Sequence, residues 1–208
     1  MALDVQSFVL DNRYAANCWV VRAQPGGPAA VIDPGGDPAP LLDAGVETAG
    51  ILVTHGDVDH VAGVAELVER SGAEVWMPAG EAEVLRSGVT RGGGDIGPYE
   101  PEHEVRGGDV VSVAGIDFDV VDVPGHSSGH VAYHADGCLF SGDLLFERSV
   151  GRVDLPGGDW DELLRSIQAL LDRFGPDAVV YPGHGGPTTL GSELASNPFL
   201  DELRTGSR

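Results

Sequence analysis

The sequence is poor in positive charge and contains no lysine. Its 12 basic residues are all arginine and stand against 33 aspartates and glutamates, which gives a formal net charge of -21. Because a nucleic-acid groove needs clustered basic side chains to neutralise phosphates, this charge argues against a nucleic-acid partner. No apolar run approaches membrane-spanning length, and no basic patch precedes a long apolar segment at the N-terminus. We therefore expect no membrane partner and a cytoplasmic location.

Cysteine is also scarce, with only Cys18 and Cys138 present. Both lie inside strand-like apolar runs, which favours buried reduced thiols over a disulfide. The 208 residues can bury a full core as one domain, and 42% apolar content with 31 glycines and 14 prolines is typical of a loop-rich α/β protein. No feature of the sequence specifies an oligomeric state.

Four side chains of metal-ligand type stand within six positions of the chain: His55, Asp57, Asp59 and His60. The apolar run at residues 50–54 predicts a buried strand, and the apolar positions between residues 61 and 68 predict an amphipathic helix. We therefore expect the cluster on a strand-to-helix loop, at the strand end where open α/β sheets place their chemistry. A cap at the helix N-terminus is the plain alternative, but it accounts for neither histidine.

Three further strand-like runs end in side chains of the same type. Residues 120–123 and 178–181 each lead into Pro-Gly-His, and residues 138–141 lead into Gly-Asp, which supplies His126, His184 and Asp143. One histidine after a strand is more often structural, but four such endings in one chain indicate a shared site. Imidazole and carboxylate are ligands of zinc, iron and manganese, and two metals need about this many of them. The residue types therefore predict a binuclear hydrolase site.

In this order the motifs resemble the metallo-β-lactamase fold superfamily over nearly the whole chain. Residues 146–159, 181–189 and 197–200 are similar to the corresponding segments of short glyoxalase II-like (hydroxyacylglutathione hydrolase-like) hydrolases. The resemblance implies an α/β (α+β) fold, a four-layer αββα sandwich of two mixed β-sheets flanked by helices. It also implies that residues 1–208 form a single metallo-β-lactamase-like domain, with no separate C-terminal helical substrate domain.

The resemblance further implies two ligand sets that share one bridging aspartate. His55, the residue at position 57, His126 and Asp143 would hold the first metal, and Asp59, His60, His184 and Asp143 would hold the second. Position 57 departs from the family, because Asp57 replaces the usual histidine. A carboxylate reaches less far than an imidazole and adds negative charge, which favours harder ions. We expect two divalent metal ions, zinc first, with iron or manganese as alternatives.

The reaction that these features indicate is hydrolysis of an acyl thioester of a low-molecular-weight thiol, such as S-lactoylglutathione. A metal-bound hydroxide would attack the carbonyl, and a metal would stabilise the oxyanion. A thiolate is already a good leaving group, so no dedicated general acid is needed. The family resemblance suggests that Asp59 both binds metal and orients the hydroxide, while Asp143 bridges the two ions.

Two other functions remain open. If Asp57 does not ligate, His55, His126 and Asp143 form the two-histidine, one-carboxylate set of oxygen-activating mononuclear iron, as in persulfide dioxygenases, which resemble glyoxalase II. The third possibility is a metal-binding protein with little hydrolase activity, in which Asp57 has spoiled the chemistry.

Other segments predict supporting roles. Arg148 and Arg152 are the basic side chains nearest the ligand-bearing segments, and either could bind a substrate carboxylate, although Arg152 could instead pair with Asp154 or Asp159. The glycine-rich residues 87–101 predict a mobile surface loop, placed like the substrate-covering region of the family.

Three local predictions concern secondary structure around the site. Residues 33–37 predict a turn with Asp37 as a helix cap. Residues 160–174 have the spacing of a packing helix, with Asp159 as its N-cap. His130 and His134, in a period-two segment, are expected behind the ligands or at the surface rather than on a metal.

Overall fold

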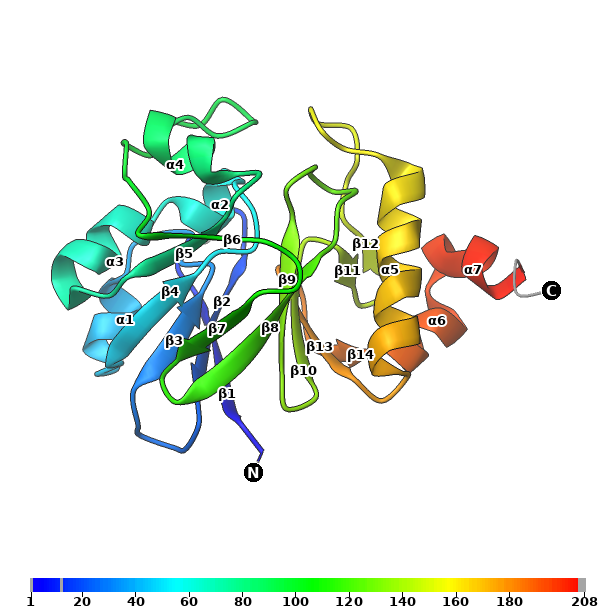
Figure 1. Cartoon of the computed structure of the whole chain (residues 1–208), viewed down its shortest axis with the longest axis horizontal. Helices are drawn as coiled ribbons and strands as arrows, with labels where there is room; N and C mark the ends of the chain where they lie inside the picture. Colours follow the sequence, from blue (N-terminus) through cyan, green and yellow to red (C-terminus); the bar gives the residue numbers. More distant parts are fainter. Residues whose placement is uncertain (1, 12, 206–208) are drawn as a thin grey trace.

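The computed structural model describes residues 2–11 and 13–205, in which two six-stranded β-sheets pack face to face (Figure 1). The first sheet contains, in order, β1 (Asp4–Val9), β2 (Asn17–Arg22), β3 (Ala29–Ile32), β4 (Thr48–Leu52), β5 (Val75–Pro78) and β6 (His103–Val105). The second contains, in order, β14 (Thr188–Thr189), β13 (Val179–Pro182), β10 (Cys138–Gly142), β9 (Val131–Ala135), β8 (Ile116–Asp122) and β7 (Val110–Val113). A separate small ribbon joins β11 (Leu145–Phe146) to β12 (Ser149–Val150).

Helices lie on the outer face of each sheet (Figure 1). The first sheet carries α1 (Ala39–Asp43), α2 (Val58–Val61), α3 (Val64–Ser71) and α4 (Ala82–Ser87). The second carries α5 (Trp160–Phe174) and α6 (Leu190–Ser196), followed by a 3₁₀ turn, η1 (Pro198–Leu200), and α7 (Asp201–Thr205). Both sheets are mixed, since β3 to β6 run parallel and so do β10 and β13, while the other pairs are antiparallel. This arrangement confirms the predicted four-layer αββα fold.

Three apolar layers hold the four structural layers together. Between the sheets, Trp19 and Ile32 of the first sheet belong to the same buried cluster as Phe118, Tyr133 and Phe140 of the second. β8 shows how the sequence builds this layer, because the buried residues Ile116, Phe118 and Val120 alternate with more exposed ones along the strand. The other two apolar layers lie between each sheet and its helices. Each sheet is therefore covered on both faces, and the site lies at the rim where the sheets meet.

The segment after β4 differs from the prediction, since Asp59 and His60 lie in the short helix α2 rather than on a loop. The predicted amphipathic helix is divided into α2 and α3 at Gly63. The amide of Gly63 donates to the carbonyl of Pro34 at 2.8 Å, and a Cβ at this position would lie 2.0 Å from the carbonyl oxygen of Gly36. Close packing of the turn after β3 thus interrupts the helix, a contact that helical spacing does not encode.

The prediction that the two cysteines form no disulfide is confirmed. Cys18 and Cys138 are free thiols, the first buried and the second half-buried. In the described ranges, no helix is both long enough and apolar enough to cross a membrane.

Helix α5 forms as predicted. Its apolar stripe of Leu163, Ile167 and Leu170 is buried against the second sheet, and the Asp159 side chain accepts a hydrogen bond from the amide of Glu162 at 2.8 Å. This bond satisfies one of the amides that a helix leaves unpaired at its first turn.

Removal of this cap gives a test of the fold. We expect Asp159→Ala to lower the free energy of unfolding by about 1 kcal/mol, because the amide of Glu162 loses its acceptor. Urea denaturation followed by circular dichroism measures the change. Asp159→Asn keeps a hydrogen-bond acceptor, so its free energy of unfolding should remain close to that of the unsubstituted protein. Equal losses of stability in both variants would show that the cap is not the cause.

Candidate metal centre

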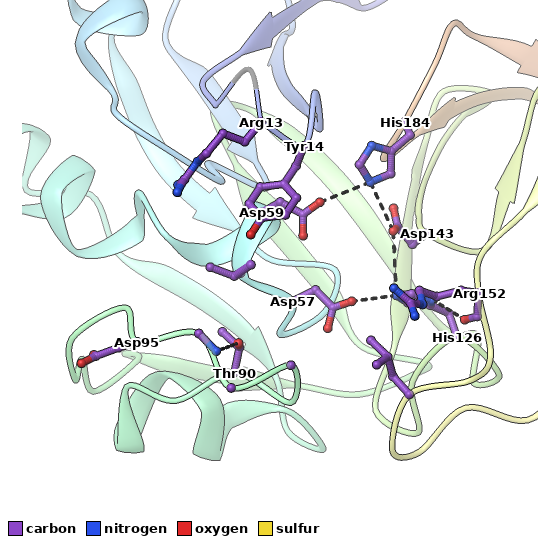
Figure 2. Close-up of a pocket in the computed structure, with 15 residues that line it drawn as sticks. Arg13, Tyr14, Asp57, Asp59, Thr90, Asp95, His126, Asp143, Arg152 and His184 are labelled. Carbon is purple, nitrogen blue, oxygen red and sulfur yellow. Dashed lines mark hydrogen bonds and ion pairs between the residues drawn. The ribbon is translucent and has the colours of Figure 1, made fainter.

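The seven predicted ligand side chains converge where strand ends of the two sheets meet. Figure 2 shows those that face the cavity: Asp57, Asp59, His126, Asp143 and His184. The four of the first motif follow β4, and the others follow β8, β10 and β13: His55, Asp57, Asp59, His60, His126, Asp143 and His184. The amide of Gly183 donates to the carbonyl of Gly142 at 2.8 Å, which ties the ends of β10 and β13 together. A Cβ at Gly183 would lie 2.1 Å from Asp143 Oδ1, so glycine is required for this approach.

The predicted second set forms a compact group. One donor atom each from Asp59, His60 and His184 lies within 4.8 Å of the others. His184 Nε2 stands 3.3 Å from Asp59 Oδ2 and 3.4 Å from Asp143 Oδ2, and His60 Nε2 stands 3.3 Å from Asp143 Oδ1. Asp143 therefore faces this set with both carboxylate oxygens.

The predicted first set also comes together. Donor atoms of His55, Asp57 and His126 lie within 4.8 Å of one another. Asp57 Oδ2 is 3.1 Å from His126 Nε2 and 3.8 Å from His55 Nε2, while Asp143 Oδ2 is 3.8 Å from His126 Nε2. Asp143 thus lies between the two sets, at the place of a bridging ligand.

A residue that the sequence did not single out, Arg91, stands at the first set. It comes from the predicted loop of residues 87–101, and its side chain is only 9% exposed. Its Nε and Nη2 donate to the two oxygens of Asp57 at 2.5 and 2.7 Å, and Nη2 also lies 2.5 Å from His126 Nε2. A further hydrogen bond joins Nη1 to the carbonyl of His126. The only signal in the sequence is that Arg91 is the one basic residue of this glycine-rich loop.

Buried hydrogen bonds orient the imidazoles from behind. Asp33, predicted only as part of a turn, is 2% exposed and accepts from the amide of Thr54 at 2.7 Å, from its hydroxyl at 2.6 Å and from His60 Nδ1 at 3.0 Å. The Thr54 hydroxyl lies 2.9 Å from His55 Nδ1, and His126 Nδ1 donates to the carbonyl of Arg152 at 2.8 Å. With Nδ1 engaged in all three rings, Nε2 is left to face the centre.

Asp33 could itself be mistaken for a ligand, because its donor atom lies within 4.8 Å of those of His55 and His60. Its oxygens are already occupied by Thr54 and His60, so its role is to orient. The prediction for Asp37 was wrong by one residue, because the N-cap of α1 is Pro38; Asp37 precedes it and accepts from the amide of Ala39 at 2.8 Å.

The two histidines expected off the metal lie in different places. His130 is 1% exposed, and its ring centroid is 4.7 Å from that of His55, directly behind the ligands. His134 stacks on Phe174 with ring centroids 4.0 Å apart and faces Asp119 at 3.7 Å, away from the centre.

Several donor atoms of the two sets make no hydrogen bond within the described part of the protein. His55 Nε2, His60 Nε2 and Asp143 Oδ1 are buried and have no hydrogen-bond partner among the residues that the structure describes. Because buried polar atoms are almost always paired, these atoms indicate a ligand that the protein binds between them. Imidazole nitrogens and carboxylate oxygens are donors for zinc, iron or manganese, so the residues fit divalent metal ions.

Charge at the site also favours cations. Burial alone would raise the pKa of Asp57, but the hydrogen bonds from Arg91 hold it well below its ordinary value. Burial alone would lower the pKa of His60, yet the charge of Asp143 and the bond to Asp33 raise it. Hydrogen bonding to Asp143 and Asp59 raises the pKa of His184 to about 9. The ionised carboxylates thus attract positive charge.

An open cavity of about 710 Å³ lies beside both sets (Figure 2). Its walls include Arg13, Tyr14 and Arg152 together with part of the loop that carries Arg91, residues 90 and 92–95. Arg152 makes the expected ion pair with Asp154 at 2.7 Å and is 60% exposed. Arg148 is exposed and does not line the cavity, while its backbone amide donates to Glu193 at 2.7 Å.

Comparison with known proteins gives a family match and similar structures. The model of the metallo-beta-lactamase superfamily matches residues 11–184. A hydroxyacylglutathione hydrolase of Haemophilus influenzae, GloC, is 32% identical over 185 residues, which are 83% of this chain and 87% of that protein.

Two solved structures are similar over nearly the full length. The BLEG-1 B3 metallo-beta-lactamase is 30% identical with a TM-score of 0.87, covering 95% of this chain and 100% of that one. TTHA1623, solved in a di-iron-bound form, is 36% identical with a TM-score of 0.78, covering 94% and 100%.

The role of Asp33 can be tested through metal affinity. We expect Asp33→Asn to lower the affinity for divalent metal about 10- to 100-fold, because an amide cannot accept all the bonds that hold Thr54 and His60. Competition with a chromophoric chelator measures the affinity. Asp37→Asn changes an exposed side chain on the same turn and should leave the metal affinity unchanged. A similar loss of affinity in this variant would assign the change to the turn rather than to the orientation of His60.

Proposed function

Because the chain belongs to the metallo-beta-lactamase superfamily of metallohydrolases, we propose that it hydrolyses an acyl thioester of a low-molecular-weight thiol, such as S-lactoylglutathione. The observation that carries the proposal is the convergence of two ligand sets on Asp143, beside an open cavity. The similarity to a hydroxyacylglutathione hydrolase over most of the chain supports the thioester over other acyl substrates.

The donor atoms and their spacing support two divalent ions. Zinc is the first choice, with iron or manganese as alternatives, because imidazole and carboxylate suit all three. When bound, such ions lower the pKa of a water molecule and polarise the carbonyl under attack. His55, Asp57 and His126 would hold the first ion, Asp59, His60 and His184 the second, and Asp143 both.

Asp59 is the residue that we assign to the attacking water. Its side chain is 14% exposed and lines the cavity, with Oδ2 3.3 Å from His184 Nε2. From this position Asp59 would help to hold the second ion, and its carboxylate would accept a hydrogen bond from the attacking water and orient it toward the carbonyl. Thiolate leaves without protonation, so the mechanism needs no acid on the opposite side.

Arg152 is the better candidate of the two predicted substrate-binding arginines. It lines the cavity and is exposed, so its guanidinium can exchange Asp154 for a substrate carboxylate. Arg148 is not among the residues that line the cavity.

One observation favours a second candidate, a mononuclear-iron dioxygenase that acts on a persulfide. Both oxygens of Asp57 are bonded to Arg91, which leaves His55, His126 and Asp143 as a two-histidine, one-carboxylate set. This enzyme would contain one iron per chain and would consume oxygen.

The two functions are separated by measuring metal per chain, thiol release and oxygen uptake on the same preparation. We expect thiol release from S-lactoylglutathione or a related thioester, without persulfide-dependent oxygen uptake. One iron per chain with oxygen uptake and no thioester cleavage would overturn the proposal in favour of the dioxygenase.

Substitution of Asp59 tests its assigned role. Asp59→Asn should reduce kcat for thioester hydrolysis about 100-fold or more, since the amide is a poor acceptor for the proton of the water. A melting curve equal to that of the unsubstituted protein shows that the fold is intact. Unchanged kcat would remove Asp59 from the mechanism.

The substrate role of Arg152 is tested against Arg148. Arg152→Ala should raise KM several-fold with little change in kcat, because it removes a cavity cation that binds substrate and transition state alike. Arg148→Ala is the matched control and should leave both constants unchanged. Equal KM values in all three proteins would exclude Arg152 from substrate binding.

A further inference from the structure

We propose that Arg91 is a resident cation of the first ligand set, which a divalent ion must displace, so that the two metal positions fill in sequence with the second position first. The inference rests on the two-ion site of the proposed function, and it concerns how that site is loaded. It assigns a role to Arg91, a residue at the centre that the proposed reaction does not use.

The contacts of Arg91 take up the atoms that a metal needs. Its guanidinium bonds to both oxygens of Asp57 and lies 2.5 Å from His126 Nε2. His126 Nδ1 donates to the carbonyl of Arg152, so Nε2 is the nitrogen that carries the free lone pair. An ion at the first position would have to use this lone pair and an oxygen of Asp57. Arg91 and the ion therefore compete for the same atoms.

The charge balance explains why the guanidinium stays. Asp57 and Arg91 form a bidentate pair in which the side chains are only 15% and 9% exposed. Loss of Arg91 would leave the negative charge of Asp57 mostly buried and unpaired. This would destabilise the protein unless another cation replaced the guanidinium. A histidine at position 57 would carry no such charge and would not hold an arginine in place. Asp57 and Arg91 thus act as a unit.

The second set has no such competitor. In the described part of the chain, no arginine makes a hydrogen bond or ion pair with Asp59, His60, Asp143 or His184. Two of the buried atoms without hydrogen-bond partners, His60 Nε2 and Asp143 Oδ1, also belong to this set. A first equivalent of metal therefore meets no resident guanidinium here, which gives the order of filling.

Displacement of Arg91 also affects the cavity wall. Arg91 lies in a tight turn in which the amide of Thr90 donates to the carbonyl of Gly94 at 2.9 Å and the amide of Gly93 donates to the carbonyl of Thr90 at 2.8 Å. The same turn lines the cavity through residues 90 and 92–95. Because the Asp57 and His126 contacts anchor the turn at the centre, loading of the first position releases it.

Metal titration tests the inference directly. Metal-free full-length protein is titrated with Zn²⁺ in competition with a chromophoric chelator, and Co²⁺ absorption is recorded in parallel. We expect two classes of site in the unsubstituted protein. In Arg91→Gln the weaker class should bind about tenfold or more tightly, because the competing guanidinium is gone, and the stronger class should be unchanged. Arg86→Gln is the matched control, because Arg86 pairs with Glu100 and Glu104 and touches no ligand atom.

Two further measurements keep the test independent of one variant. Asp57→His removes the carboxylate that holds Arg91. In this variant the affinities of the two classes of metal site should also become more similar. In the unsubstituted protein, hydrogen exchange of amides 88–95 should increase with the second equivalent of Zn²⁺ and not with the first. Identical isotherms for the unsubstituted protein and Arg91→Gln, together with exchange that is unaffected by metal, would overturn the inference.

These outcomes are distinct from failure of the proposed function. Shifted isotherms without any thioester cleavage would retain the role of Arg91 and reject the hydrolase. Thioester cleavage with identical isotherms would retain the hydrolase and reject the role of Arg91.

Discussion

Buried negative charge is the constraint on which this site depends. Asp57 and Asp143 stand at the rim between the two sheets, and Asp33 lies behind them, all largely removed from water. An ionised carboxylate in such a place is unfavourable unless cations or hydrogen bonds compensate it. The imidazoles of both sets, the amide and hydroxyl of Thr54 and the guanidinium of Arg91 meet this need in the protein. Divalent ions would meet it more completely.

The fold satisfies the constraint by bringing strand ends from both sheets to one rim. β4 leads into the first motif, and β10 and β13 run parallel, so that Asp143 and His184 emerge side by side. Glycine at position 183 makes the close approach possible, since any Cβ there would collide with Asp143. The apolar layers around each sheet hold these ends rigidly, which is what a site with several converging ligands requires.

Sequence reasoning succeeded where the information is local and failed where it is not. The donor side chains it singled out do meet, because each follows an apolar strand, and the cap at Asp159 needs only its own helix. The loop placement of Asp59 and His60 was wrong because the division of the helix at Gly63 depends on the distant turn after β3. Proximity in sequence pointed to Arg148 and Arg152, whereas the arginine at the centre, Arg91, comes from the glycine-rich loop of residues 87–101.

By itself, the sequence determined the family, the four-layer fold and the chemical type of the donors, because strand periodicity and motif order are written in consecutive residues. Only the tertiary structure decided that Asp33 turns inward to His60, 27 residues away, and that Arg91 reaches Asp57 across 34 residues. The physical reason is that such contacts arise from the packing of sheets, helices and a glycine-rich loop around one rim. No spacing along the chain specifies them, yet they set the charge and the orientation of the centre.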